Sequence, residues 1–284
     1  MKPEPLDDGL RKDPRALIKA FHLKPKKSLG QNFLVSPAGI EKVIRAAELS
    51  GEDDVLEIGA GLGTLSLALA DSSKHVVVIE LDTDLIPALT WVLADSPNVE
   101  VVHGDILTME LCDLGLHQHY AVVANIPYNI TSRLVRKLLE SSFPADRVVL
   151  TIQDEVARRM VAAPGEMNLL ALGVQAYGQP VIQAAIPAEA FFPQPKVDSA
   201  VIRIDRFPVP RLSPEQLNPF FDLARAGFSQ RRKQLPNALS RGLGLTKDEV
   251  RSMLEESQIP PTSRAQELTL EDWIRLADQY RISY

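Results

Sequence analysis

Short runs of β-branched residues alternate with helix-like segments through the first two-thirds of this 284-residue chain. Repeated strand–helix–strand units form right-handed crossovers and build a mainly parallel sheet, so the sequence predicts an α/β fold. Seven strands are expected, at Val55–Ile58, Val76–Glu80, Val99–His103, Ala121–Ala124, Val148–Ile152, Val181–Ile186 and Ser199–Ile204. Helical patterns fill the gaps, at Pro37–Leu49, Asp82–Leu93, Thr131–Glu140 and Asp154–Val161.

The connection between the last two expected strands does not suit a crossover helix. Only a dozen residues separate Ile186 from Ser199, and they include Pro187, Pro193 and Pro195. A parallel return needs about a dozen or more residues, usually helical, and proline disrupts a helix interior. We therefore expect the seventh strand to run antiparallel and to form a hairpin with the sixth.

A proline-rich break at Phe207–Pro214 separates this region from a C-terminal part that has no strand pattern. We expect a flexible tail over residues 1–20, because the first dozen residues are polar and charged. An α/β domain over 21–207 and a helical domain over 208–284 are then expected to follow. The helices expected in the last domain are Glu215–Phe228, Lys247–Glu256 and Leu270–Gln279.

Composition and net charge limit the metals, membranes and nucleic acids that we expect this chain to bind. The single cysteine, Cys112, cannot form an internal disulfide or a cysteine-based metal site, and we expect no bound metal. No apolar run is long enough to span a bilayer, so we expect no membrane partner and a reducing, cytoplasmic location. The formal net charge of −6 argues mildly against a nucleic-acid partner.

Basic residues nevertheless cluster in two places, and each cluster can either bind phosphates or form a solvated helix face. The clusters are Lys24, Lys26 and Lys27 near the N-terminus, and Arg225, Arg231, Arg232, Lys233 and Arg241 in the C-terminal part.

Three signals follow the first three expected strands. The glycines of Glu57–Gly63 allow a tight turn and close approach to a ligand, although a strand-to-helix turn alone would also explain them. Glu80, about 20 residues further on, can accept both hydroxyls of a ribose or be a solvated acid at a strand end. Asp105 can accept a hydrogen bond from an adenine amino group or cap a turn.

The fourth signal, Asn125-Ile126-Pro127-Tyr128, follows the fourth expected strand, and a turn alone does not explain its tyrosine. Ligands of open α/β sheets bind outside the carboxyl ends of the strands, so the four signals are expected to meet in one cleft.

This fourth motif fits the methylation of an aromatic amine. An adenine amino nitrogen is a poor nucleophile because the ring delocalises its lone pair. The Asn125 side-chain oxygen and the carbonyl of Ile126 or Pro127 can accept its N–H groups and stabilise the positive charge that develops on the nitrogen. Pro127 stiffens the segment, and the Tyr128 ring can stack on the base and face the cation.

The base must leave a duplex stack to enter such a cleft, and a second aromatic ring would hold its other face. Phe191 and Phe192 are the candidates, and either of them can equally belong to the core.

These motifs resemble those of the rRNA adenine dimethyltransferase family, over roughly residues 20–275. The segments that carry the resemblance are Lys27–Leu34, Glu57–Gly63, Val78–Asp82, Gly104-Asp105, Asn125–Thr131, Phe191–Ser199, Phe228–Lys233 and Arg264–Leu268. The last part of the chain favours the bacterial 16S rRNA branch, linked to kasugamycin resistance, over the 23S rRNA methylases that confer macrolide resistance.

The resemblance implies a doubly wound, Rossmann-like S-adenosylmethionine methyltransferase sheet of seven strands, the last one antiparallel, with a small C-terminal helical domain. It implies an enzyme that dimethylates the N6 amines of two adjacent adenines near the 3′ end of 16S rRNA. The expected partner is the immature small ribosomal subunit, and a monomer is expected.

The resemblance and the motifs together assign roles to individual residues. The expected catalytic residues are Asn125, Pro127, Tyr128 and Phe191. The expected S-adenosylmethionine-binding residues are Gln31, Asn32, Leu34, Gly59, Gly61, Glu80, Leu81, Asp105 and Asn125. The expected RNA-binding residues are Lys26, Lys27, Arg231, Arg232 and Lys233.

The sequence departs from the family pattern at one place, and two other functions remain as alternatives. Family members commonly carry Tyr-Gly-Arg-Leu-Ser where this chain has Met167–Ala171, so Leu169 replaces an arginine and an RNA or loop contact there is in doubt. A nicotinamide dehydrogenase would account for the glycines and Glu80 but does not call for Asn125–Tyr128. A non-catalytic assembly factor for the small subunit is also possible, and both roles can coexist in one protein.

Overall fold

The computed structural model describes residues 11 and 13–283, and the chain divides into two compact units. The first comprises residues up to 157 and 181–206, and the second comprises 158–180 and the residues from 207 on. The division after Arg206 falls at the proline-rich break. Residues 158–180, expected in the α/β domain, instead belong with the C-terminal helices, because Gly165 and Met167 donate main-chain hydrogen bonds to the Gln266 carbonyl.

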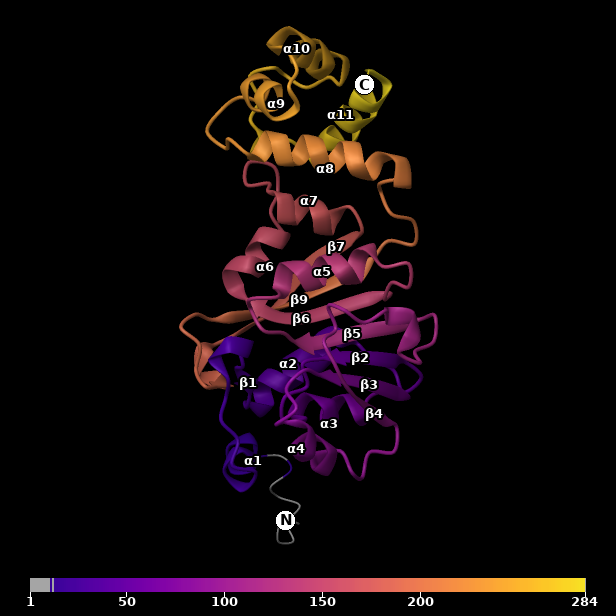
Figure 1. Ribbon diagram of the computed structural model, residues 1–284, viewed down its shortest axis with the longest axis vertical. Helices are drawn as coiled ribbons and strands as arrows, with labels where there is room; N and C mark the ends of the chain where they lie inside the picture. Colours follow the sequence, from indigo (N-terminus) through magenta and orange to yellow (C-terminus); the bar gives the residue numbers. More distant parts are fainter. Residues whose placement is uncertain (1–10, 12, 284) are drawn as a thin grey trace. The chain divides into compact units, whose positions relative to one another are not determined.

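A seven-stranded sheet forms the centre of the first unit (Figure 1). Its strands are β2 (Asp54–Ile58), β3 (His75–Glu80), β4 (Val99–His103), β5 (Tyr120–Asn125), β6 (Arg147–Gln153), β7 (Gly178–Ile186) and β9 (Ser199–Arg206). The spatial order is β4-β3-β2-β5-β6-β9-β7. The first five strands pair in parallel and β9 is antiparallel to β6, next to β7. The expected mixed sheet with an antiparallel last strand is confirmed.

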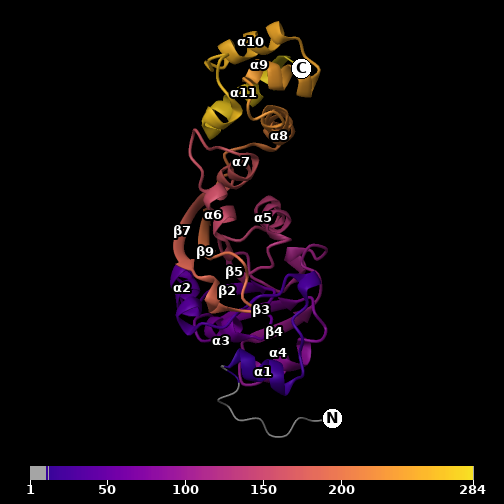
Figure 2. The ribbon, with the colours of Figure 1, turned by 90° about the vertical axis from the view of Figure 1, so that its left-hand side faces the viewer.

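Helices cover both faces of the sheet, which is why its central strands are nearly continuous apolar runs. Figure 2 shows α2 (Pro37–Ala47) and α3 (Thr64–Ala70) on one side and α5 (Thr131–Glu140) on the other. Buried residues of α2, α3 and α4 (Ile86–Val92) share one hydrophobic cluster with alternate residues of the strands. α6 (Asp154–Met160) follows β6.

The helix expected at Asp82–Leu93 begins only at Ile86. Residues 82–85 form a turn instead, in which Leu85 N donates to the Asp82 carbonyl at 3.0 Å. The Asp82 side chain accepts hydrogen bonds from Lys26 and Gln31 of the N-terminal segment.

The expectation of a flexible tail over residues 1–20 is wrong for Pro14–Ala20, which form helix α1. Asp13 caps this helix by accepting hydrogen bonds from two main-chain N–H groups, and Leu17 is fully buried in the cluster beneath it. The polar composition of the first dozen residues concealed this short apolar stripe. The rest of the expected tail, residues 1–10 and 12, lies outside the described residues.

A second, two-stranded sheet joins two segments that are far apart in the sequence. β1 (Phe33–Leu34) pairs antiparallel with β8 (Phe191–Phe192), with Leu34 opposite Phe191. Strands of two residues carry no periodic signal, so the sequence pattern did not predict them. Short 3-10 helices lie at Lys27–Leu29 (η2), Leu111–Asp113 (η3) and Ala188–Ala190 (η4).

The second unit is helical, as expected for its C-terminal part. Its helices are α7 (Leu169–Gln175), α8 (Pro214–Phe228), α9 (Leu235–Leu243), α10 (Lys247–Glu256) and α11 (Leu270–Ser283), with η5 at Ala265–Glu267. Phe220 and Trp273 are the largest fully buried side chains of its core. Leu169, at the start of α7, is 39% exposed, while Asn168 caps the helix. Among the described residues no helix has the length and apolarity required to cross a bilayer.

Candidate active site

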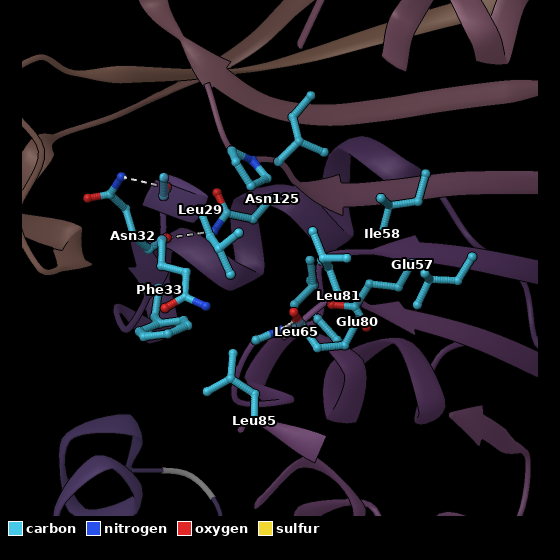
Figure 3. A pocket seen from close by; sticks show the side chains of 18 of the residues that line it. Leu29, Asn32, Phe33, Glu57, Ile58, Leu65, Glu80, Leu81, Leu85 and Asn125 are labelled. Carbon is cyan, nitrogen blue, oxygen red and sulfur yellow. Dashed lines mark hydrogen bonds between the residues drawn. The ribbon is translucent and has the colours of Figure 1, made fainter. Parts of the chain in front are cut away.

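A cleft lies at the carboxyl ends of β2, β3, β4 and β5, where open α/β sheets bind their ligands. Figure 3 shows side chains from these strand ends and from the segment before α2 gathered around it. Every residue expected to bind the cofactor lies in its lining, namely Gln31, Asn32, Leu34, Gly59, Gly61, Glu80, Leu81, Asp105 and Asn125. Pro127 and Tyr128 also line it.

The glycine turn after β2 allows two segments to approach closely. Gly59 and Gly61 have φ values of 73° and 60°, which residues with a Cβ rarely adopt. A Cβ on Gly61 would also lie 2.8 Å from a ring carbon of Phe33. Both positions therefore require glycine for the turn, and Gly61 also requires it for the contact with Phe33 in the segment before α2.

Two main-chain donors orient the carboxylate of Glu80. Gly61 N donates to Oε2 at 2.8 Å, and Asp82 N donates to Oε1 at 2.7 Å. Glu80 is 6% exposed, and this burial raises its pKa above the usual value. Each carboxylate oxygen retains a lone pair, so the group can accept further hydrogen bonds from hydroxyls such as those of a ribose.

Leu81 and Asp105 form the neighbouring part of the lining. Asp105 Oδ1 accepts a hydrogen bond from Leu107 N at 2.9 Å, so the aspartate serves the turn after β4 as well as facing the cleft. Leu81 is 47% exposed between two buried acids and offers an apolar surface to a ligand.

Glu57 is a buried acid that stands in the sequence as the first residue of the glycine motif. It lines the cleft, is 1% exposed, and its Oε2 has no hydrogen-bond partner among the described residues. Burial raises the pKa of Glu57 to about 8, and the nearby Glu80 carboxylate adds to the increase. Glu57 is therefore mostly protonated at pH 7. An acidic residue inside an otherwise apolar strand was the available signal.

The side chain of Asn125 is fixed by the segment before α2. Its Nδ2 donates to the main-chain carbonyl of Asn32 at 3.0 Å, as the dashed line in Figure 3 shows. The Asn32 side chain in turn donates to the Gly30 carbonyl at 3.1 Å. Because the amide nitrogen of Asn125 is engaged and its oxygen accepts no hydrogen bond from the described residues, the oxygen is available as an acceptor in the cleft.

Tyr128 is held at the far end of its ring. Its hydroxyl lies 2.8 Å from Oγ of Ser199, a fully buried residue at the start of β9. Burial raises the pKa of Tyr128, so the phenol stays neutral. The sequence around Ser199 carries no signal of this contact, which spans 71 residues.

Phe191 does not join these residues. It is 2% exposed, belongs to the hydrophobic cluster, and is absent from the cleft lining. The structure thus favours the core role for Phe191 over the expected stacking role. Phe192 is partly exposed, and its ring lies beneath the Arg15 guanidinium, 5.9 Å from the ring centroid.

The expected RNA-binding residues differ in their surroundings. Lys26 is engaged within the protein, since its Nζ is paired with Asp82 at 2.6 Å and with Asp84 at 2.7 Å. Lys27 is exposed and forms no ion pair with any described residue. The remaining three, Arg231, Arg232 and Lys233, are exposed on the loop between α8 and α9 of the second unit.

No group of His, Cys, Asp and Glu side chains in the described part of the chain has a metal-binding arrangement. The cleft instead has hydrogen-bond acceptors spread over the ends of four strands. This arrangement suits a neutral or cationic organic ligand.

Comparisons with known proteins agree with this arrangement. The model of the ribosomal RNA adenine dimethylase family matches residues 22–281. Ribosomal RNA small subunit methyltransferase A of Dehalococcoides mccartyi strain CBDB1 is 40% identical over 94% of this chain and 92% of its own length. The protein of the same name from Alkaliphilus metalliredigens is 39% identical over 93% of this chain and 95% of its own length.

Two solved structures share the fold. The 23S rRNA methyltransferase ErmE superposes with a TM-score of 0.70 and 28% identity, over 87% of this chain and 99% of its own. A dimethyladenosine transferase from Plasmodium falciparum superposes with a TM-score of 0.73 and 25% identity, over 85% of this chain and 94% of its own. The cleft motifs and the full-length match together show that this chain belongs to the ribosomal RNA adenine dimethylase family.

Proposed function

We propose that this protein transfers methyl groups from S-adenosylmethionine to the N6 amines of two adjacent adenines near the 3′ end of 16S rRNA, dimethylating each one in immature small subunits. The observation that carries the proposal is the Asn125 amide, which Asn32 holds with its oxygen free at the carboxyl end of β5. An acceptor fixed before the substrate arrives is what amine methylation requires.

The cleft fits S-adenosylmethionine, which supplies an electrophilic methyl group when bound. Glu80 is oriented to accept the ribose hydroxyls, and Asp105 lies where it can accept from the adenine amine of the cofactor. The Oε2 atom of Glu57, which has no hydrogen-bond partner in the described part of the chain, is a buried polar atom that a ligand donor would satisfy. The glycine turn leaves room beside Phe33 for a close backbone contact.

The target amine is activated by acceptors rather than by a base. Asn125 Oδ1 accepts one N–H, and the Ile126 carbonyl accepts the other, since the Pro127 carbonyl already accepts from Ile130 N at 3.2 Å. Together they draw the lone pair of the amine out of the ring and stabilise the positive charge that forms on the nitrogen. Tyr128 stacks on the base, and the proton leaves to water after transfer.

Ser199 is expected to support this step by holding the Tyr128 ring. Ser199→Ala removes one neutral hydrogen bond and should lower kcat about 2–10-fold, the equivalent of about 0.5–1.5 kcal/mol. The Tyr128→Phe background provides the control, because without the phenol hydroxyl the alanine should have no further effect. Steady-state kinetics of the two single variants and the double variant measure this. Equal losses from Ser199→Ala in both backgrounds would show that the serine does not act through Tyr128.

The names of the relatives support small-subunit rRNA as the substrate. The alternative substrate to be tested is 23S rRNA, on which ErmE acts. The protein is incubated with labelled S-adenosylmethionine and with small or large subunits that lack their adenine methylation. Nucleoside analysis is expected to find N6,N6-dimethyladenosine in 16S rRNA alone. Label confined to 23S rRNA, or the absence of dimethyladenosine, would overturn the proposal.

We further propose that the loop carrying Arg231, Arg232 and Lys233 binds rRNA phosphates, because its three cations are exposed. Changing all three to glutamine should reduce the slope of log binding constant against log salt by about two to three units. Filter binding to small subunits between low and moderate salt measures the slope. Lys74→Gln, which changes an exposed lysine just before β3, is the control, and an unchanged slope in the triple variant would exclude the contact.

A further inference from the structure

Residues Lys26–Leu34, called the strap here, run past the cleft and are fastened at both ends. Leu29 to Leu34 line the cleft on one side. At the far end, the Asn32 carbonyl accepts from Asn125 Nδ2 and Phe33–Leu34 pair with β8. The strap therefore links the end of β5 to the sheet that contains Phe191.

The strap is also fastened by the buried carboxylate of Asp82, which contacts Lys26 and Gln31. Asp82 Oδ1 is 2.6 Å from Lys26 Nζ, and Asp82 Oδ2 accepts from Gln31 Nε2 at 2.7 Å. The Gln31 Oε1 atom closes the network by accepting from Lys26 N at 2.7 Å. Both ends of the strap thus depend on contacts that cross more than 50 residues of sequence.

The position of Asp82 connects this network to the cleft. Asp82 comes two residues after Glu80, and its own main-chain N–H donates to the Glu80 carboxylate. Its side chain is 2% exposed, and hydrogen bonds from Lys26 and Gln31 help to lower its pKa despite the burial. The same turn therefore orients a cleft acid and anchors the strap.

We propose, on the basis of the function proposed above, that Lys26, Gln31 and Asp82 are positioning residues that latch the strap over the bound cofactor. The latch slows cofactor release and keeps the Asn32 carbonyl in place for Asn125. Lys26 and Gln31 thus act on S-adenosylmethionine through the strap.

The geometry distinguishes this latch from an ordinary surface ion pair. Exposed pairs contribute little, but removing Lys26 leaves the buried Asp82 charge without its cation. Asp84, the second partner of Lys26, is 66% exposed in its side chain and should matter less. This difference supplies an internal control, since Asp82 and Asp84 contact the same ammonium group.

The test measures binding of S-adenosylhomocysteine by calorimetry, independently of methyl transfer. Lys26→Met and Asp82→Asn are each expected to raise Kd about tenfold, which corresponds to about 1.4 kcal/mol. Lys26→Arg should retain most of the affinity, and the double variant Lys26→Met with Asp82→Asn should bind no worse than either single variant. Asp84→Asn and Lys27→Met, the neighbouring unpaired lysine, should remain within about twofold of wild type.

A second readout follows the strap itself. Trypsin cleavage after the exposed Lys27 should be faster in Asp82→Asn than in wild type, and saturating S-adenosylhomocysteine should suppress it in both. Thermal unfolding identifies variants that fail to fold. The latch is overturned if folded Lys26→Met and Asp82→Asn proteins bind as tightly as wild type and are cleaved no faster. Absence of binding by the wild-type protein would instead overturn the proposed function.

Discussion

Replacing Asn125 with alanine should lower the rate of methyl transfer about 10²–10³-fold, the loss typical of removing one preorganised polar group from a charged transition state. The side chain contributes an acceptor that is already oriented, because its amide nitrogen is bound to the Asn32 carbonyl. Alanine removes the acceptor and leaves that carbonyl without its donor. Single-turnover methyl transfer to undermethylated small subunits measures the chemical step directly.

The neighbouring Asn129 provides a matched control for this variant. It lies four residues further along the same segment and is exposed. Asn129→Ala should keep most of the single-turnover rate. In Asn125→Ala, the affinity for S-adenosylhomocysteine should change much less than the single-turnover rate. Near-normal transfer by folded Asn125→Ala would refute the acceptor role and with it the proposed chemistry.

Replacing Glu57 with glutamine should stabilise the first unit at neutral and alkaline pH. The pKa of Glu57 is raised from 4.5 to about 8, so the folded state holds a proton that the unfolded chain releases. Its contribution to stability is complete below about pH 4.5 and is lost as the pH rises toward 8. Glutamine resembles the protonated acid at every pH, so the advantage of the variant should grow to the order of a few kcal/mol by pH 8.

Urea unfolding between pH 5 and pH 9 measures this difference. The chain has two tryptophans, Trp91 in the first unit and Trp273 in the second. In a Trp273→Phe background, Trp91 fluorescence therefore follows the unit that contains Glu57. Glu100→Gln changes an exposed glutamate on β4, and its free energy of unfolding should vary with pH in the same way as that of the reference protein. If the free energy of unfolding of Glu57→Gln also follows that of the reference protein at every pH, then Glu57 does not change its protonation state on folding.

Local patterns were enough to predict the sheet and the acceptors that follow its first four strands. Each strand shows its apolar run within a few residues, and the prolines between Ile186 and Ser199 were enough to predict the antiparallel last strand. Glu80, Asp105 and Asn125 come together because parallel strands place their carboxyl ends at one edge. Their identification required only strand positions and residue chemistry.

Contacts across long stretches of sequence account for the corrections. Helix α1 was missed because its apolar stripe is short and lies beside a polar region, and Leu17 is buried only once the sheet provides a core. The ion pairs of Lys26 with Asp82 and Asp84 likewise join segments that are far apart in the sequence. Phe191 and Phe192 are equivalent in the sequence, and only their pairing with β1 separates a core ring from a partly exposed one.

By itself, the sequence determined the α/β class, the antiparallel last strand and the acceptors at the strand ends of the cleft, because hydrophobic periodicity and strand-end chemistry are local properties. The tertiary structure alone decided that Lys26 and Gln31 fasten the strap to Asp82, that Ser199 holds Tyr128 and that Glu57 is protonated. These features depend on the burial of charges and on hydrogen bonds between distant segments, and such contacts exist only after the strands have taken their order in space.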